Sequence, residues 1–308
     1  MRVDVVTGAN GFIGKAVTKE LLSKGDFVYA VVTDPKGMSD LNSERLQVVQ
    51  AFFEDYQSLP TKFKQPIDVW YHFAWQGVWG PAFKDYKLQL SNAANARMAI
   101  EVAKQCHTSK FVLASTVNVL ETKKKITIQG PQQLRYTTNY AMAKLTAEML
   151  CKTYSENEGI SFNCAYLAMA YGPGNGSLMV PNVVISKLML GISPDLVEGN
   201  GLYDLIYIDD IAKGFVAIGE KGQQMKSYYL GHSSLTTFKD LFTKLARVIN
   251  PKIPLNFGAY PDDNQLDYSQ ISLNELETDT GFKPSSNFSE SILTTGKWLK
   301  EHDYLGVK

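Results

Sequence analysis

The sequence contains few of the residues that disulfide frameworks and metal sites require. Its 308 residues include three cysteines and four histidines. Cys106, Cys151 and Cys164 lie far apart and form no Cys-x-x-Cys pair, so we expect reduced, inert thiols. No His-Glu-x-x-His pattern is present, and the sequence predicts no metal site.

The chain also lacks net charge and long apolar runs. Its 31 basic and 31 acidic residues balance, which gives no general attraction to nucleic acid or to an anionic membrane. No apolar run approaches the roughly 18 residues of a membrane helix. A glycine-rich segment begins within about ten residues of Met1, which leaves no room for a signal peptide. We therefore expect a cytoplasmic protein whose partner is a small molecule, with no nucleic acid or membrane partner.

Short apolar runs alternate with amphipathic stretches in the first half of the chain, as in βαβ units. Strands are expected at 3–6, 27–32, 46–51, 69–74, 110–114 and 162–167, and helices at 92–106 and 140–156. Beyond residue 174 the alternation fades, with helices expected at 181–190 and 238–248 and short strands at 196–197 and 205–208. The predicted fold class is α/β, a Rossmann-type doubly wound parallel sheet. The dinucleotide-binding domain spans 1–172 with later returns to the sheet at about 205–230, and 173–308 form mainly a smaller C-terminal substrate-binding lobe.

Residues 7–14, Thr-Gly-Ala-Asn-Gly-Phe-Ile-Gly, directly follow the first apolar run. Glycines at Gly-x-x-Gly-x-x-Gly spacing permit a tight turn, close approach of a pyrophosphate and close packing of helix on strand. The N-terminus of the next helix then presents free N–H groups to the anion. A glycine-rich turn without a ligand is the alternative, against which the flanking strand and amphipathic helix argue. The residues expected to hold a dinucleotide here are Gly8, Asn10, Gly11, Phe12, Ile13 and Gly14.

The second predicted strand leaves the choice between NAD and NADP open. NAD enzymes commonly place an acid at the end of this strand, where it accepts a hydrogen bond from the ribose 2′-hydroxyl. If the strand ends at Val32, Thr33 and Lys36 are placed to meet a 2′-phosphate instead. If it continues one or two residues further, Asp34 selects NAD. The expectation favours NADP over NAD.

The ordered motifs resemble those of the extended short-chain dehydrogenase/reductase family, in the NAD-dependent epimerase/dehydratase group that acts on nucleotide sugars. The resemblance covers nearly the whole chain. It rests on the phosphate loop, a Tyr140-x-x-x-Lys144 pair, Ser115-Thr116, Trp298 and the segments 68–74, 171–174, 207–212 and 281–284. It implies that Phe73 and Ala74 line the cofactor and that Asp55 faces the adenine, a surface acid being the alternative. It also implies a homodimer formed through the helices at 92–106 and 140–156.

The Tyr140–Lys144 pair suits hydride chemistry. A secondary alcohol gives up hydride only as its hydroxyl proton leaves, so a base must touch that oxygen. Free tyrosine has a pKa near 10, and a neighbouring cation favours the phenolate. An exposed helix pair is the alternative reading, which the phosphate loop and Ser115-Thr116 disfavour. We expect Tyr140 as acid/base, Lys144 to lower its pKa and to bind the nicotinamide ribose, and Thr116 to hydrogen-bond the reacting oxygen, with Ser115 a weaker candidate.

Three further motif residues are expected to have structural roles. His72 is expected to be a core histidine, and Asp209 and Asp210 are expected to cap or brace a helix.

The departures from the family pattern concentrate on the substrate side. Tyr203 stands where several relatives place an arginine on the substrate diphosphate, and a second such arginine would fall near Ala259 or Tyr260. Gln89 replaces a cofactor-side asparagine. Tyrosine cannot grip phosphate in the bidentate manner of a guanidinium. Either Arg135, Lys187 and backbone N–H groups hold the diphosphate, or the substrate is not a nucleotide sugar.

The loop after the fourth predicted strand carries two indoles. Trp75 and Trp79 can stack on a sugar ring or a base, and packing between the lobes is the alternative. Val117-Asn118 follows Thr116, where 4,6-dehydratases of the family carry Asp-Glu, so a dehydratase is not expected. The candidate substrate-binding residues are Trp75, Trp79, Thr116, Tyr166 (which replaces another arginine), Lys187 and Tyr203.

Together these observations predict an NAD(P)-dependent oxidoreductase or epimerase that acts at a carbinol carbon of a nucleotide-activated sugar, with C4 the expected position. A 4-ketoreductase is favoured over a 4-epimerase because the acid of the second strand is uncertain. The alternatives are an NADPH-dependent reductase of a non-nucleotide carbonyl compound and a non-catalytic dinucleotide-binding protein. The nucleotide base and the sugar are left open.

Overall fold

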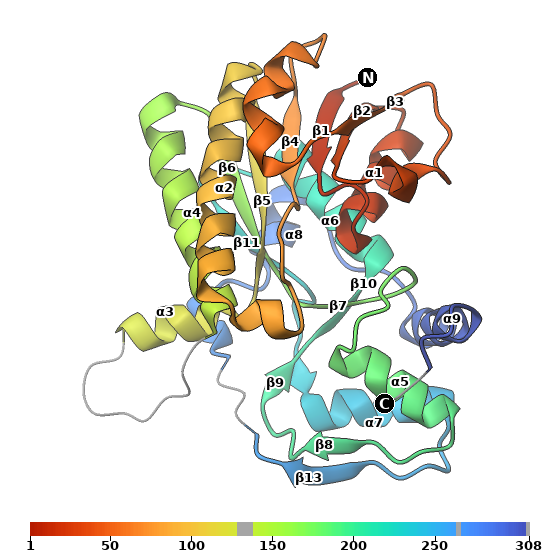
Figure 1. Ribbon diagram of the computed structural model, residues 1–308. Coiled ribbons are helices and arrows are strands. Elements are labelled where there is room, and N and C mark those ends of the chain that lie inside the picture. The colour runs from red at the N-terminus through yellow and green to blue at the C-terminus, as the bar shows by residue number, and fades with distance from the viewer. Residues whose placement is uncertain (128–137, 263–265, 306–308) are drawn as a thin grey trace.

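A parallel sheet of seven strands forms the centre of the protein (Figure 1). The computed structural model describes residues 1–127, 138–262 and 266–305. The strands run in the order β11-β6-β5-β4-β1-β2-β3, and every neighbouring pair is parallel. Their bounds are β1 Val3–Thr7, β2 Phe27–Val32, β3 Leu46–Gln50, β4 Val69–His72, β5 Lys110–Thr116, β6 Ser161–Leu167 and β11 Ser227–Leu230. The carboxyl ends therefore meet at one edge, and the strand order reverses between β1 and β4, where ligands of such sheets bind.

Four long helices cover the two faces of this sheet. In Figure 1, α2 (Tyr86–Gln105) and α4 (Asn139–Glu158) lie together on one face, and α1 (Phe12–Ser23) and α6 (Ile208–Lys221) lie on the other. Both faces of the strands are thus buried, which explains their continuous apolar runs. α2 begins earlier than the predicted 92–106 because the Asp85 carboxylate accepts from Lys87 N and Leu88 N and caps the helix.

A second, smaller apolar core lies in the C-terminal lobe. Buried side chains that include Val184, Leu188, Phe242, Leu245 and Ile292 form it. Its elements are α5 Val180–Met189, β8 Asp195–Val197, β9 Leu202–Tyr203, β12 Thr236–Thr237, α7 Phe238–Ile249, β13 Asn256–Tyr260 and α9 Phe288–Glu301. β8 pairs with β13, and β9 pairs with β12. This core is separate from the one around the large sheet.

The chain crosses between the two parts several times. β7 (Met169–Tyr171) pairs with β10 (Leu205–Tyr207) outside the large sheet, after which α6 and β11 return to the large sheet. Asp210 in α6 accepts hydrogen bonds from Ser285 N and Ser286 N, which makes it a structural acid as predicted. The remaining elements are α3 Val119–Thr127, α8 Glu275–Thr280 and the 3₁₀ turns η1 Pro35–Met38, η2 Phe53–Thr61, η3 Pro81–Lys84 and η4 Tyr268–Gln270.

One carboxylate is buried inside the sheet. Asp4 on β1 is 0% exposed, and neither of its oxygens has a hydrogen-bond partner among the described residues. Burial raises its pKa to about 7, against a smaller opposing effect of Arg2. The folded state therefore prefers the neutral acid, whereas the unfolded chain ionises near pH 3.9. Below about pH 3.9 Asp4 is neutral in both states and lowers the free energy of unfolding least. This stability is lost as the pH rises through about 7.

We expect Asp4→Asn to stabilise the fold in a pH-dependent manner. The gain in free energy of unfolding should be near zero at pH 4 and grow to roughly 2–4 kcal/mol at pH 8, because one pKa unit corresponds to about 1.4 kcal/mol. Urea unfolding at several pH values measures it, with exposed Glu44→Gln as the control that should show no such trend. A gain that is equal at pH 4 and pH 8 would contradict this account of Asp4.

Candidate functional site

The phosphate loop joins β1 to α1 in the conformation that its glycines permit. Gly8 has φ +68°, and a Cβ there would lie 2.8 Å from Ala74 N. A Cβ on Gly14 would lie 2.3 Å from Gly8 O, so α1 can approach the turn this closely only with glycine. The ring of Phe12 lies against Gly174 of the 171–174 turn. The loop is therefore fixed between the end of β4 and that turn.

The N-terminus of α1 suits an anion. Gly11 is its N-cap residue and supplies no side-chain cap, and the first turn contains no acidic residue. The N–H groups of Phe12, Ile13 and Gly14 have no intrahelical acceptors at this end of a helix, and the helix dipole is left uncompensated. These features fit the pyrophosphate of a dinucleotide.

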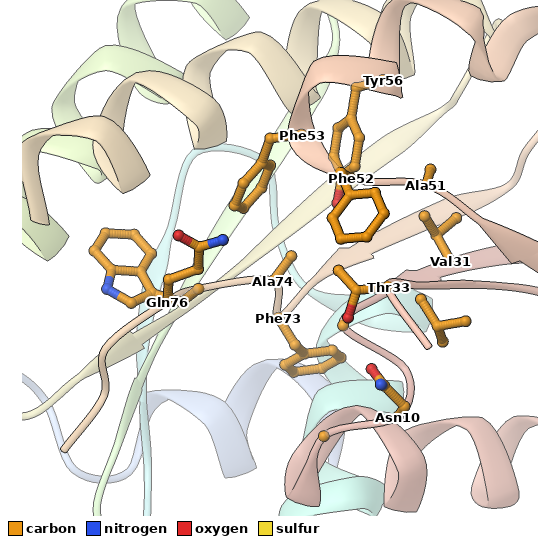
Figure 2. Close-up of a pocket in the computed structure, with 14 residues that line it drawn as sticks. Asn10, Val31, Thr33, Ala51, Phe52, Phe53, Tyr56, Phe73, Ala74 and Gln76 are labelled. Carbon is orange, nitrogen blue, oxygen red and sulfur yellow. The ribbon is translucent and has the colours of Figure 1, made fainter. Parts of the chain in front are cut away.

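A cavity of about 260 Å³ opens above this loop. Figure 2 shows Phe52, Phe53 and Tyr56 along one side of it, with Phe73 and Asn10 across from them. The residues that line it are Gly8, Asn10, Gly11, Val31, Val32, Thr33, Ala51, Phe52, Phe53, Tyr56, Phe73, Ala74, Trp75 and Gln76. The aromatic wall of Phe52, Phe53 and Tyr56 was not predicted from the sequence. The available signal was the aromatic cluster directly after the third strand, at the carboxyl edge of the sheet.

Asp34 and Asp55, the acids expected near the cofactor, each accept a hydrogen bond from a backbone N–H close in sequence. β2 ends at Val32, so Thr33 lines the cavity, whereas the exposed Asp34 accepts from Lys36 N and caps η1. The strand end is the one that the sequence analysis associated with NADP. Yet no lysine or arginine is among the residues that line this cavity, and a 2′-phosphate would find no cation there. Asp55 is also exposed, does not line the cavity, and accepts from Phe52 N at 2.9 Å.

Tyr140 and Lys144 lie on one face of α4, toward the sheet. The Lys144 ammonium is 5.7 Å from the centre of the Tyr140 ring, and it donates to Ala114 O of β5 at 2.9 Å. Burial lowers the pKa of Lys144 to about 7 and raises that of Tyr140. We expected Lys144 to favour the phenolate, but in the protein alone burial dominates and favours the neutral form of each group.

Thr116 is the last residue of β5, the strand whose Ala114 carbonyl accepts a hydrogen bond from Lys144. It is half-buried at the end of β5, two residues after Ala114, and its Oγ1 accepts from Asn118 N at 3.3 Å. Ser115, by contrast, is buried beside Cys164 of β6. Of the two hydroxyls, only that of Thr116 is partly accessible at the carboxyl edge.

The loop after β4 connects the cavity with this pair. Trp75 lines the cavity, lies 3.7 Å from the Lys144 ammonium by its ring centre, and meets the Tyr140 ring edge-on at 6.1 Å. Phe83 stacks on Tyr140 at 4.7 Å. Gln89 of α2 accepts from Trp75 Nε1 at 2.8 Å. The glycine-lined cavity and the Tyr–Lys pair thus share one wall.

The other candidate substrate residues are not brought together. Tyr166 is 1% exposed, and its hydroxyl donates to the buried carboxylate of Glu148 at 2.6 Å, so its side chain offers no open surface to a substrate. Tyr203 packs against Phe238 and Phe242 in the lobe core. Lys187 is half-buried on α5, Trp79 is 59% exposed, and Arg135 lies outside the described residues.

The remaining sequence expectations concern structure and chemistry outside this edge. His72 is a buried core histidine, as predicted: it is 1% exposed, its Nδ1 lies 2.8 Å from Thr7 Oγ1, and burial lowers its pKa to about 3. The cysteines are all free and buried. Within 1–127, 138–262 and 266–305, no three His, Cys, Asp or Glu side chains are grouped to hold a metal, and no helix has the length and apolarity of a membrane span.

Comparison with known proteins gives a consistent result. The sequence model of the NAD dependent epimerase/dehydratase family matches residues 5–231. UDP-glucuronate 4-epimerase 3 of Arabidopsis thaliana is 24% identical over 332 residues, covering 98% of this chain and 76% of that protein. UDP-glucuronate 4-epimerase of Thermodesulfobacterium geofontis is 26% identical over 319 residues, covering 97% and 96%. A solved structure of UDP-glucuronic acid 4-epimerase from Bacillus cereus, in complex with UDP-glucuronic acid and NAD, has TM-score 0.75 and 21% identity, covering 98% and 100%; this likeness shows the fold.

Gly14→Ala should disrupt dinucleotide binding. Its Cβ would meet the Gly8 carbonyl, so α1 must move away from the loop. We expect the dissociation constant to rise about tenfold or more in calorimetric titration, equivalent to at least ~1.4 kcal/mol. Lys19→Ala, on the exposed face of the same helix, is the matched control and should bind as the unaltered protein does. Wild-type affinity in a folded Gly14→Ala protein would show that this loop does not hold the dinucleotide.

Proposed function

On the premise that the chain belongs to the NAD dependent epimerase/dehydratase family, we propose that it is a nucleotide-sugar 4-epimerase that uses NAD. The observation that carries the proposal is the shared wall described above. Trp75 lines the glycine-containing cavity and also contacts Tyr140 and Lys144, so a dinucleotide in the cavity would reach the pair. The family is one of enzymes, in agreement with the prediction of an enzyme over a redox-silent binding protein.

NAD is proposed in place of the NADP that the sequence favoured. The absence of basic side chains from the lining of the described cavity removes the partner that a 2′-phosphate requires. The Bacillus cereus relative was solved with NAD. When bound, this cofactor supplies the hydride acceptor and a positive ring.

The 4-epimerase is proposed in place of the 4-ketoreductase. Relatives that match nearly all of this chain are named 4-epimerases of UDP-glucuronate or of UDP-glucose. The residues fit either outcome, because both reactions need a group that takes or returns a proton at the C4 oxygen. In the proposed roles Tyr140 exchanges that proton, Thr116 hydrogen-bonds the same oxygen, and Lys144 supplies the charge that favours the phenolate.

We also propose that the enzyme is a homodimer through α2 and α4. These helices lie side by side and leave large apolar side chains exposed (Figure 1): Tyr86, Leu90, Met142, Met149 and Leu150. A second copy of the same surface would cover them.

Light scattering should give twice the mass of one chain. The double variant Leu90→Glu with Met149→Glu should give the mass of a monomer. A monomeric unaltered protein would contradict the dimer.

The reaction itself is tested with UDP-glucuronate and UDP-glucose. The purified protein with NAD should convert one of them to its 4-epimer, as followed by NMR of the sugar protons. Tyr140→Phe should lower kcat by about 10²–10⁴-fold, the range for loss of a general acid/base. Tyr154→Phe, on the same helix but beside Arg97 at its surface, is the matched control.

Two other results would each contradict the proposal in a different way. Oxidation of NADPH by a 4-keto nucleotide sugar, without epimer formation, would identify the reductase. Absence of any thermal shift with UDP, dTDP, CDP and GDP would point to a substrate that is not a nucleotide sugar.

A further inference from the structure

The Lys144 ammonium is buried without an acidic partner. It is 5% exposed, and in the described part of the chain its one hydrogen bond goes to Ala114 O. The titratable groups that face it are Cys164 of β6, His72 of β4 and Tyr140 on its own helix, each buried or half-buried, and none of them supplies a negative charge at neutral pH. A charge removed from water in this way needs another source of stabilisation.

The face of the Trp75 indole provides that stabilisation. The ammonium lies 3.7 Å from the centre of the indole, compared with 5.7 Å from the Tyr140 ring. Tryptophan is the strongest of the aromatic partners for a cation, and the attraction is largest where the cation is desolvated. The same indole meets Tyr140 edge-on, so one side chain contacts both members of the pair.

Gln89 of α2 fixes this indole through its N–H group. Its side chain is completely buried on α2. Oε1 accepts from Trp75 Nε1 at 2.8 Å, and Nε2 donates to Gly77 O at 2.7 Å and Ala82 O at 3.0 Å. A flipped amide would place its N–H groups against the indole N–H and its oxygen against two carbonyls, so the three bonds define a single orientation.

The loop that carries Trp75 is held to the same helix at a second point. Asn92, one turn after Gln89 and 1% exposed, accepts from Gln76 N at 3.0 Å and donates to Gln76 O at 2.8 Å. Buried amides are costly unless each polar atom is bonded. Gln89 and Asn92 therefore hold the loop after β4 rigidly against α2 and fix the position of the Trp75 ring.

We propose that Gln89 and Trp75 are positioning residues for catalysis: Gln89 fixes the indole so that its face holds the Lys144 ammonium beside Tyr140. The role of Lys144 in turnover rests on the proposed function, but the contact itself does not. The tests are therefore divided into one that needs neither cofactor nor substrate and one that measures turnover.

The first test follows tryptophan emission between pH 5 and 9 in the cofactor-free protein. A Trp298→Phe background removes a second indole, which stacks on His302 at 4.5 Å. The emission of Trp75, obtained by subtracting the Trp75→Phe variant, should change with a midpoint near 7, the pKa of Lys144. Lys144→Met should abolish this change. Gln89→Leu, which cannot accept from the indole N–H, should reduce its amplitude at least about twofold, since the contact depends on ring position.

Persistence of the full transition in Lys144→Met, or an unchanged amplitude in Gln89→Leu, would overturn the proposal whatever reaction the enzyme performs. Far-UV circular dichroism of each variant verifies the fold.

The second test measures the pH dependence of kcat. Trp75→Leu removes the aromatic face, so the limb on which activity falls with deprotonation of Lys144 should move to lower pH by about one unit. Trp75→Phe keeps a smaller aromatic face, so the same limb should move to lower pH by a smaller amount than in Trp75→Leu. Gln89→Leu should lower kcat about tenfold with KM within about twofold, whereas Trp298→Phe should match the unaltered enzyme.

The order of action is tested by combining the variants. If Gln89 acts through the indole, Gln89→Leu should lower kcat little further once Trp75→Leu is present. Multiplication of the two separate losses, or an unshifted pH profile in Trp75→Leu, would show that these residues only support the loop.

Discussion

A desolvated ammonium is the constraint on which the candidate site depends. Lys144 is buried against Ala114 O and the Trp75 indole, and no acidic side chain among the described residues pairs with it. A buried charge without an acidic partner is costly, and burial lowers the pKa of this lysine to about 7. Its charge is therefore sensitive to whatever lies at the carboxyl edge of the sheet. Trp75 contacts this ammonium and also lines the cavity above the phosphate loop, so the loop after β4 lies between helix α4 and the cavity.

Local sequence patterns were sufficient to predict most of the fold. The apolar runs predicted the strands because each is buried on both faces, and β1, β2 and β6 lie within a residue or two of the expected bounds. The phosphate loop was predictable because only glycine permits the contacts of Gly8 and Gly14. The return of α6 and β11 was given only as a block at 205–230, since the sequence does not show which segment pairs with β6 and which with β7.

The site was less predictable, because its contacts join residues far apart in the chain. The Tyr140–Lys144 spacing indicated a shared helix face, but not that burial would dominate the ionisation of both groups. Gln89 was recognised only as a departure from the family, and its bond to Trp75 spans 14 positions. Tyr166 was placed with the substrate because it replaces an arginine, whereas its hydroxyl satisfies the buried Glu148. Such pairings arise from tertiary packing and have no local sequence signal.

The central claim is that a charged Lys144 allows the Tyr140 hydroxyl to ionise in the loaded enzyme, and difference absorbance at the tyrosinate band tests it most directly. In protein saturated with NAD, one tyrosine should ionise near or below pH 7, where Lys144 still carries its charge, instead of near the ordinary value of 10. This ionisation should be missing in Tyr140→Phe and should shift to higher pH in Lys144→Met. A titration curve that neither substitution alters would contradict the account.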